Sequence, residues 1–99
     1  MASETQYQHK LIKKIQKLLP GAFVLKNDPT DLQGLPDLLV LYESRWAMLE
    51  VKTGPRAHIQ PNQEYYVERL NEMSFAAFIY PANEEDVLNA LQQSLRAPR

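Results

Sequence analysis

Apolar residues recur at helical spacing near the start of the chain. The repeat of three and four residues predicts an amphipathic helix with one buried stripe. Its members are Tyr7, Leu11, Ile12, Ile15, Leu18 and Leu19. Ser3 and Gln6 have the spacing of a capping box, in which each side chain accepts a hydrogen bond from the other residue's backbone N–H. We therefore expect the helix to begin at Ser3 and to stop at Pro20 and Gly21.

Three shorter apolar segments that follow are typical of strands. Residues 22–26 (AFVLK) form the first of them. The run from Pro36 (PDLLVLY) and residues 46–53 (WAMLEVKT) are separated by the tight connection Glu43 to Arg45, and they should pair as a hairpin. The run from Pro36 is apolar on both faces, which predicts a central strand covered on two sides.

The second half of the chain alternates helix, strand and helix. Pro61 suits the first turn of a helix that runs to about Glu72. Residues 75–80 (FAAFIY) indicate a buried strand. Asn83 should then cap a last helix. The inward residues of these two helices are Gln63, Tyr66, Val67 and Leu70, then Val87, Leu88, Leu91 and Leu95. Strand, helix and strand across Glu50 to Tyr80 imply a right-handed crossover. The order α-β-β-β-α-β-α thus predicts an α/β fold, a mixed β-sheet flanked by helices.

Length and composition narrow this picture. Ninety-nine residues is the length of one domain, so we expect a single stand-alone domain over residues 1–99 whose target recognition comes from the same fold or from oligomerisation. The formal net charge of -1 does not by itself indicate nucleic-acid binding. A nuclease with clustered carboxylates nevertheless carries local negative charge that bound metal ions offset. The absence of cysteine excludes disulfides, zinc knuckles and thiol catalysis.

The N-terminal segment, Met1 to Lys10, is polar. No apolar run in the sequence approaches the roughly 20 residues that a membrane span needs. We therefore expect a soluble, unexported, cytoplasmic protein that does not bind membranes.

The residues with the clearest chemistry are Asp37, Glu50 and Lys52. Side chains alternate between the two faces of a strand, so Glu50 and Lys52 should project to the same side. Asp37 opens the neighbouring strand, and a hairpin that turns near Glu43 to Arg45 brings it roughly opposite residues 50–52. The sequence therefore predicts that two carboxylates and one ammonium converge.

Phosphodiester hydrolysis requires this set of groups. Mg²⁺ prefers hard oxygen ligands, and a cation near the attacking water stabilises the developing charge. We expect Asp37 and Glu50 to hold Mg²⁺, for which Mn²⁺ should substitute, with the Val51 carbonyl as a further ligand and Lys52 orienting the water. The alternative is that Asp37 caps a loop while Glu50 and Lys52 form a surface ion pair, worth about 0 to 1 kcal/mol.

In these motifs the chain resembles the VRR-NUC domain (virus-type replication-repair nuclease), a branch of the PD-(D/E)xK superfamily that includes Holliday-junction resolvases. The resemblance extends from Glu4 to about Leu91. It implies a restriction-endonuclease-like fold with Asp37, Glu50 and Lys52 as the signature residues, Glu4 as a further metal ligand and Gln63 as a catalytic polar residue. The chain departs from the family where R-G-I-P-D is replaced by residues 33–37 (QGLPD), and where Ser74 replaces a glycine. These departures concern substrate contacts rather than chemistry.

The sequence around Glu4 and Gln63 supports these roles but leaves alternatives open. Glu4 continues the inward stripe of the first helix, and an acid there needs a partner such as a metal ion. It is equally a first-turn glutamate favoured by the helix dipole. Gln63 shares the stripe of its helix, where it either holds a water or phosphate oxygen or satisfies buried backbone groups.

Basic residues offer candidate DNA contacts. One face of the first helix should carry four lysines at i, i+3, i+4 and i+7 spacing. These lysines either contact a phosphate backbone or are simply solvated. They are Lys10, Lys13, Lys14 and Lys17. Arg56 and His58 follow Lys52 in a loop where substrate could enter. The interpretation favoured for His58 is nevertheless a plain surface histidine.

Together these features predict a Mg²⁺-dependent deoxyribonuclease. The resemblance to resolvases implies branched DNA, such as four-way junctions, as its substrate. We expect a homodimer, because one active site cuts one strand and a domain of this size covers little DNA by itself. Two other hypotheses remain. One is a catalytically inactive nuclease-fold module that binds DNA or another subunit, and the other is an α/β interaction domain in which the motif is accidental.

Overall fold

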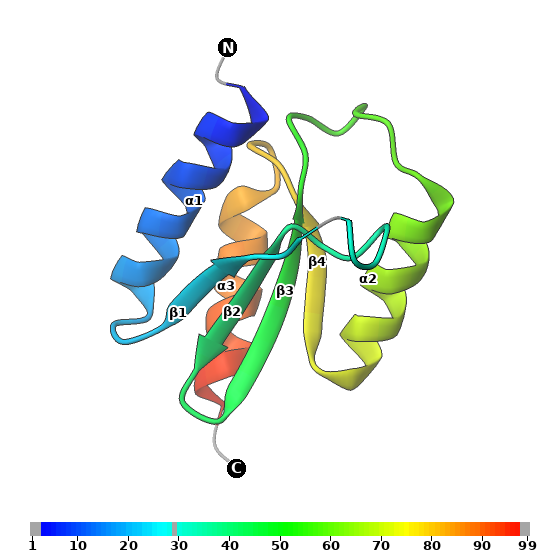
Figure 1. Cartoon of the computed structure of the whole chain (residues 1–99). Coiled ribbons are helices and arrows are strands. Elements are labelled where there is room, and N and C mark those ends of the chain that lie inside the picture. Colours follow the sequence, from blue (N-terminus) through cyan, green and yellow to red (C-terminus); the bar gives the residue numbers. More distant parts are fainter. Residues whose placement is uncertain (1–2, 29, 98–99) are drawn as a thin grey trace.

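The computed structural model describes residues 3–28 and 30–97 and contains the seven elements in the predicted order (Figure 1). They are α1 (Glu4–Leu18), β1 (Phe23–Lys26), β2 (Leu38–Tyr42), β3 (Arg45–Val51), α2 (Pro61–Met73), β4 (Phe75–Ile79) and α3 (Glu84–Arg96). The strands form one sheet in the order β1-β2-β3-β4. The first two pairings are antiparallel and β3 pairs with β4 in parallel, so the predicted mixed sheet is confirmed.

The helices cover the two faces of the sheet unequally. Helices α1 and α3 lie on one face and α2 lies on the other (Figure 1). The core between the sheet and α1 and α3 consists of buried apolar side chains. It comprises Tyr7, Leu11, Ile15, Leu19, Leu38, Val40, Ala47, Leu49, Val51, Ile79, Leu88, Leu91 and Leu95. Every second residue of β3 belongs to it, so the residues between them point to the α2 face.

The prediction that β2 is covered on both sides is wrong for one face. Leu38 and Val40 are fully buried, whereas Leu39 and Leu41 on the opposite face are only half-buried. The reason is that α2 packs on β3 and β4 and does not extend across β1 and β2. The α2 face of β1 is consequently open, with Phe23 69% and Leu25 48% exposed.

The first helix begins as its sequence predicts. The Gln6 backbone N–H donates to the Ser3 hydroxyl at 3.2 Å, and the Ser3 N–H donates to the Gln6 side chain at 2.9 Å. The helix ends before Pro20 and Gly21, and Gly21 has a φ of +92° that favours glycine. This capping box fixes where α1 starts, and therefore where Glu4 lies.

The predicted cap of α3 is wrong in its chemistry. Asn83 occupies the N-cap position, but its side chain makes no capping hydrogen bond. Its amide instead accepts from the Tyr80 N–H and donates to the Phe78 carbonyl. Asn83 therefore stabilises the turn that leaves β4 rather than the first turn of the helix.

Two strands are shorter than predicted at the end that bears the candidate site. Strand β2 begins at Leu38 rather than Pro36, and β3 ends at Val51 rather than Thr53. The last residue pair of the β3–β4 ladder is Val51 and Ile79. Lys52 is nevertheless held, since its backbone N–H donates to the Ile79 carbonyl at 2.9 Å.

Among the described residues no helix combines the length and the apolar character needed to cross a membrane.

Replacing Leu49 by alanine should lower the free energy of unfolding by about 2–5 kcal/mol, because the side chain is fully buried in β3 and its loss leaves a cavity. The matched control is Met73→Ala at the exposed end of α2, which should cost less than about 1 kcal/mol. Urea titration followed by circular dichroism measures both. Equal losses for the two variants would contradict the core described above.

Candidate active site

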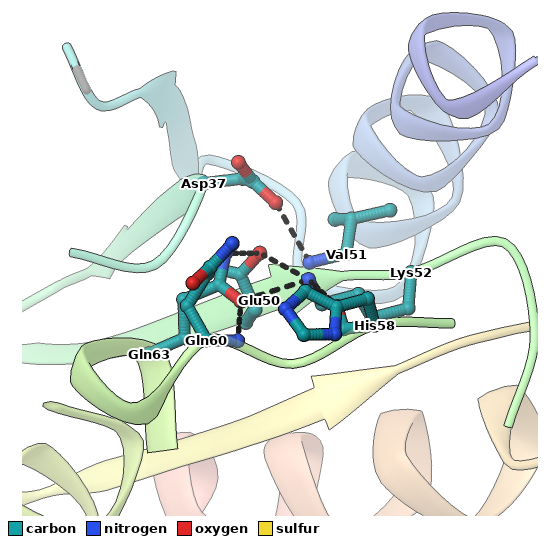
Figure 2. A network of polar contacts seen from close by, with 7 residues as sticks. All are labelled: Asp37, Glu50, Val51, Lys52, His58, Gln60 and Gln63. Carbon is teal, nitrogen blue, oxygen red and sulfur yellow. Dashed lines mark hydrogen bonds and ion pairs between the residues drawn. The ribbon is translucent and has the colours of Figure 1, made fainter. Parts of the chain in front are cut away.

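The hairpin of β2 and β3 brings Asp37 to Glu50. Leu38 pairs with Leu49, so residue 37 lies opposite residue 50. The Val51 backbone N–H donates to Asp37 Oδ2 at 2.9 Å, which fixes the carboxylate at the end of the sheet (Figure 2). Glu50 points to the α2 face and is only 3% exposed. The predicted convergence of the two carboxylates is present.

Lys52 joins this pair on the same side of the chain. Its Nζ lies 3.8 Å from Glu50 Oε2, and the side chain is 12% exposed. Nζ also donates to the His58 carbonyl at 3.0 Å and to Gln63 Oε1 at 2.9 Å. These two hydrogen bonds and the ion pair with Glu50 hold the Lys52 ammonium in one place (Figure 2).

Gln63 connects the lysine to the glutamate. Its Oε1 accepts from Lys52 Nζ and, at 2.9 Å, from the Gln60 backbone N–H. Its Nε2 donates to Glu50 Oε2 at 3.4 Å. A side-chain amide can accept from a cation at its oxygen and donate to a carboxylate at its nitrogen. Gln63, at the first turn of α2, is thus brought into the site as predicted.

Two backbone groups of this network were not predicted from the sequence. The His58 carbonyl is a backbone group, so the identity of residue 58 carries no signal for it. The Gln60 N–H is orphaned at the start of α2, where a side chain three residues on can accept from it. That spacing of Gln60 and Gln63 was the available signal.

Burial sets the electrostatics of Glu50. Removal from water, then the neighbouring Asp37 carboxylate, raise the pKa of Glu50 to about 8, with a smaller contribution from Glu4. Lys52 acts in the opposite direction but does not compensate. Near neutral pH the protein therefore holds a carboxyl group that would ionise readily only if more positive charge were supplied.

These residues fit a divalent cation. Asp37 and Glu50 are hard oxygen donors, the Lys52 ammonium lies 3.8 Å from Glu50, and the burial of Glu50 makes its charge costly without a further cation. Glu4 lies near enough to affect Glu50, but within residues 3–28 and 30–97 no three Asp, Glu, His or Cys side chains form a compact metal-binding group. The roles of Glu4 and of the Val51 carbonyl as ligands remain predictions.

The loop that carries Asp37 is packed tightly on α2. Gly34 has a φ of +93°, and a Cβ atom there would lie 2.7 to 2.9 Å from Asn62. Only glycine allows this approach. Gln33, Gly34, Gln60, Asn62 and Gln63 line a polar hollow of about 440 Å³ beside the site. The close contact with Asn62 was not predicted, because a single glycine in a loop does not indicate its neighbour.

The predicted DNA-contacting residues lie outside this network. The four lysines of α1 (Lys10, Lys13, Lys14 and Lys17) are exposed, and Lys14 forms an ion pair with Glu84. Lys17 is thirteen residues beyond Glu4, or about 20 Å along the helix axis, so the run leads away from the site. Arg56 is exposed in the loop after Lys52.

The chain was compared with known proteins. Its sequence matches no family model, and no curated protein matches it. A solved structure described as a "VRR_NUC domain protein" is similar, with a TM-score of 0.69 and 16% sequence identity over 97% of this chain and 90% of that chain. The chain therefore has a VRR-NUC-like fold, which confirms the resemblance and the restriction-endonuclease-like arrangement at the level of the fold.

Replacing Glu50 by glutamine should stabilise the metal-free protein at pH 8.5 and have little effect near pH 4.5. A raised folded-state pKa means that the folded protein binds the proton more tightly, so its stability falls as the pH rises from the ordinary value of 4.5 to about 8. Glutamine has no such proton. The expected gain at pH 8.5 is at least about 5 °C in Tm.

Thermal unfolding in EDTA at both pH values measures this difference. Glu68→Gln is the matched control, because Glu68 is exposed on α2 and its replacement should leave Tm nearly unchanged at either pH. A wild-type protein more stable than Glu50→Gln at pH 8.5 would contradict this account of the site.

Proposed function

We propose that this VRR-NUC-like fold serves a divalent-metal-dependent deoxyribonuclease that hydrolyses internal phosphodiester bonds. The observation that carries the proposal is the convergence of Asp37, buried Glu50 and Lys52 at one end of β2 and β3. The set combines carboxylate ligands for a hard cation with a positioned ammonium. A surface ion pair would require neither the burial of Glu50 nor the amide of Gln63.

Asp37 and Glu50 would hold Mg²⁺, or Mn²⁺ in its place, with the Val51 carbonyl and Glu4 as further ligands. When bound, the ion supplies charge neutralisation at the phosphate and a lower pKa for water. The Val51 N–H occupies one lone-pair site of Asp37 Oδ2, and the remaining lone-pair sites of the carboxylate would serve a cation. The Gln63 amide steadies Glu50 from the α2 side.

Lys52 would act on the attacking water and on the charge that develops at the phosphate. Its ammonium is fixed by Gln63 and the His58 carbonyl, and a donor fixed before the reaction stabilises charge without having to reorganise. Gln63 is the positioning residue for this ammonium. The contact with Glu50, at 3.8 Å, is the longest of its three and the easiest to exchange for substrate.

We further propose that the substrate is branched DNA, such as a four-way junction, and that two copies act together. One active site cuts one strand, and a domain of this size covers little DNA by itself. The open α2 face of β1, with Phe23 and Leu25 exposed, supports a second copy as the occupant of that surface. The exposed lysines of α1 and Arg56 would contact phosphates.

A catalytically inactive DNA-binding or subunit module is the second candidate. The observation that favours it is that no compact group of three acidic or histidine side chains is formed among the described residues. The two candidates differ in metal binding, because an inactive module needs no ion between Asp37 and Glu50.

Replacing Lys52 by alanine should abolish DNA cleavage, with a loss of at least about 100-fold, and leave metal affinity largely intact because an ammonium is not a ligand. The assay is incubation with linear, nicked, flapped and four-way DNA in Mn²⁺. Arg69→Ala is the control, since Arg69 pairs with Glu72 on the surface of α2, and it should cut normally. Equal loss of cleavage and of metal affinity in Lys52→Ala would show that this role is misassigned.

Replacing Asp37 by alanine should remove the heat of Mg²⁺ or Mn²⁺ binding in isothermal titration. Asp37→Asn provides the sharper comparison, because it keeps an acceptor for the Val51 N–H and removes only the charge. Both variants should bind the ion at least about tenfold more weakly. Titrations indistinguishable from wild type would overturn the catalytic assignment in favour of the inactive module.

A further inference from the structure

A second hollow opens beside the candidate active site. It has a volume of about 780 Å³, and its walls include Tyr7, Thr53, Pro55, Arg56, Ala57 and Pro81. The start of α1, the loop after β3 and the turn after β4 meet at the same end of the sheet (Figure 1). This volume lies within the range of about 300–1,000 Å³ that is usual for small-ligand sites.

The hollow is continuous with the candidate site along the chain. Its wall begins at Thr53, one residue after Lys52, and consecutive Cα atoms are about 3.8 Å apart. Tyr7 lies one turn after Glu4 in α1, about 4.5 Å along the axis. The hollow and the candidate site therefore share one end of the sheet, with Tyr7 placing the hollow on the α1 side and Glu50 pointing to the α2 side.

The lining combines a fixed aromatic ring, prolines and a cation. Tyr7 is 7% exposed, and the surrounding core side chains hold its ring in place. Burial together with Glu84 raises the pKa of its hydroxyl. Pro55 and Pro81 present rigid apolar surface at the exposed side. Arg56 is the charged residue of the lining, and its side chain is exposed to solvent.

We propose that this hollow receives one unpaired nucleobase of the substrate DNA, with Arg56 contacting the phosphate that carries it. The inference rests on the proposed function and specifies how that site selects its substrate. A nucleobase has a flat apolar face that packs on aromatic and carbon surfaces, and its backbone is anionic, which complements Arg56.

This assignment gives a physical reason for selecting branched DNA. A base within a duplex is stacked and paired, and extracting it costs a few kcal/mol of unstacking, whereas a base that is already unpaired costs least. A hollow that takes a base thus favours the nucleotides at branch points and single-stranded ends. Uninterrupted duplex would leave the hollow unfilled.

The test is DNA binding in EDTA, which does not depend on cleavage or on metal. The probe is a forked DNA with a single-stranded branch, in a series where an abasic residue replaces one nucleotide at a time around the branch point. Fluorescence anisotropy measures Kd for each probe. Wild type should bind about tenfold more weakly when the base that enters the hollow is missing.

Ala57→Phe should fill the hollow and abolish this discrimination, so that intact and abasic DNA bind alike. Ser44→Phe is the matched control, because it adds the same ring at the exposed turn between β2 and β3, and it should retain the tenfold difference. Arg56→Ala should weaken binding of both probes while preserving their ratio. Thermal unfolding of each variant verifies that it is folded.

The proposal is overturned if wild type discriminates less than about twofold at every abasic position, if Ala57→Phe discriminates as wild type does, or if wild type binds none of these probes. Its failure is separable from that of the proposed function. Cleavage without base discrimination would reject only the proposal that the hollow binds a base. Discrimination without cleavage in Mn²⁺ would reject the catalytic proposal and support the base site.

Discussion

The arrangement depends on a buried carboxylate that its surroundings do not neutralise. Glu50 is removed from water beside Asp37, and Lys52 compensates only in part. Burying charge is unfavourable unless it is paired and hydrogen-bonded. The neighbouring groups are arranged around this constraint, because Gln63 donates to the carboxylate and fixes the ammonium at the same time.

The rest of the fold places these groups while keeping the site polar. The α1 and α3 side of the sheet takes the apolar residues of β3, so the alternate positions are available for Glu50 and for Lys52 just beyond the strand. Helix α2 then delivers Gln63 from its first turn. Stability and chemistry are thus assigned to opposite faces of one strand, and α2, which packs on β3 and β4, leaves β1 uncovered.

Much of this could be predicted from the sequence, because it follows from side-chain periodicity. Strand alternation and a tight hairpin suffice to bring Asp37, Glu50 and Lys52 together. Side-chain patterns do not predict backbone acceptors such as the His58 carbonyl. They also do not predict that the Asn83 side chain forms hydrogen bonds with the turn after β4 rather than with the first turn of α3. The prediction that β2 is covered on both faces was wrong for a related reason. The apolar sequence of a strand does not show which strands a helix from another part of the chain will cover.

The turn between β2 and β3 has a role beyond connecting two strands. Glu43 adopts a φ of 55°, and Tyr42 pairs directly with Arg45. Because faces alternate residue by residue, one additional amino acid absorbed by β3 would rotate its side chains by half a turn and send Glu50 into the hydrocarbon interior. The length of this exposed turn therefore constrains the candidate site, although no reacting group lies near it.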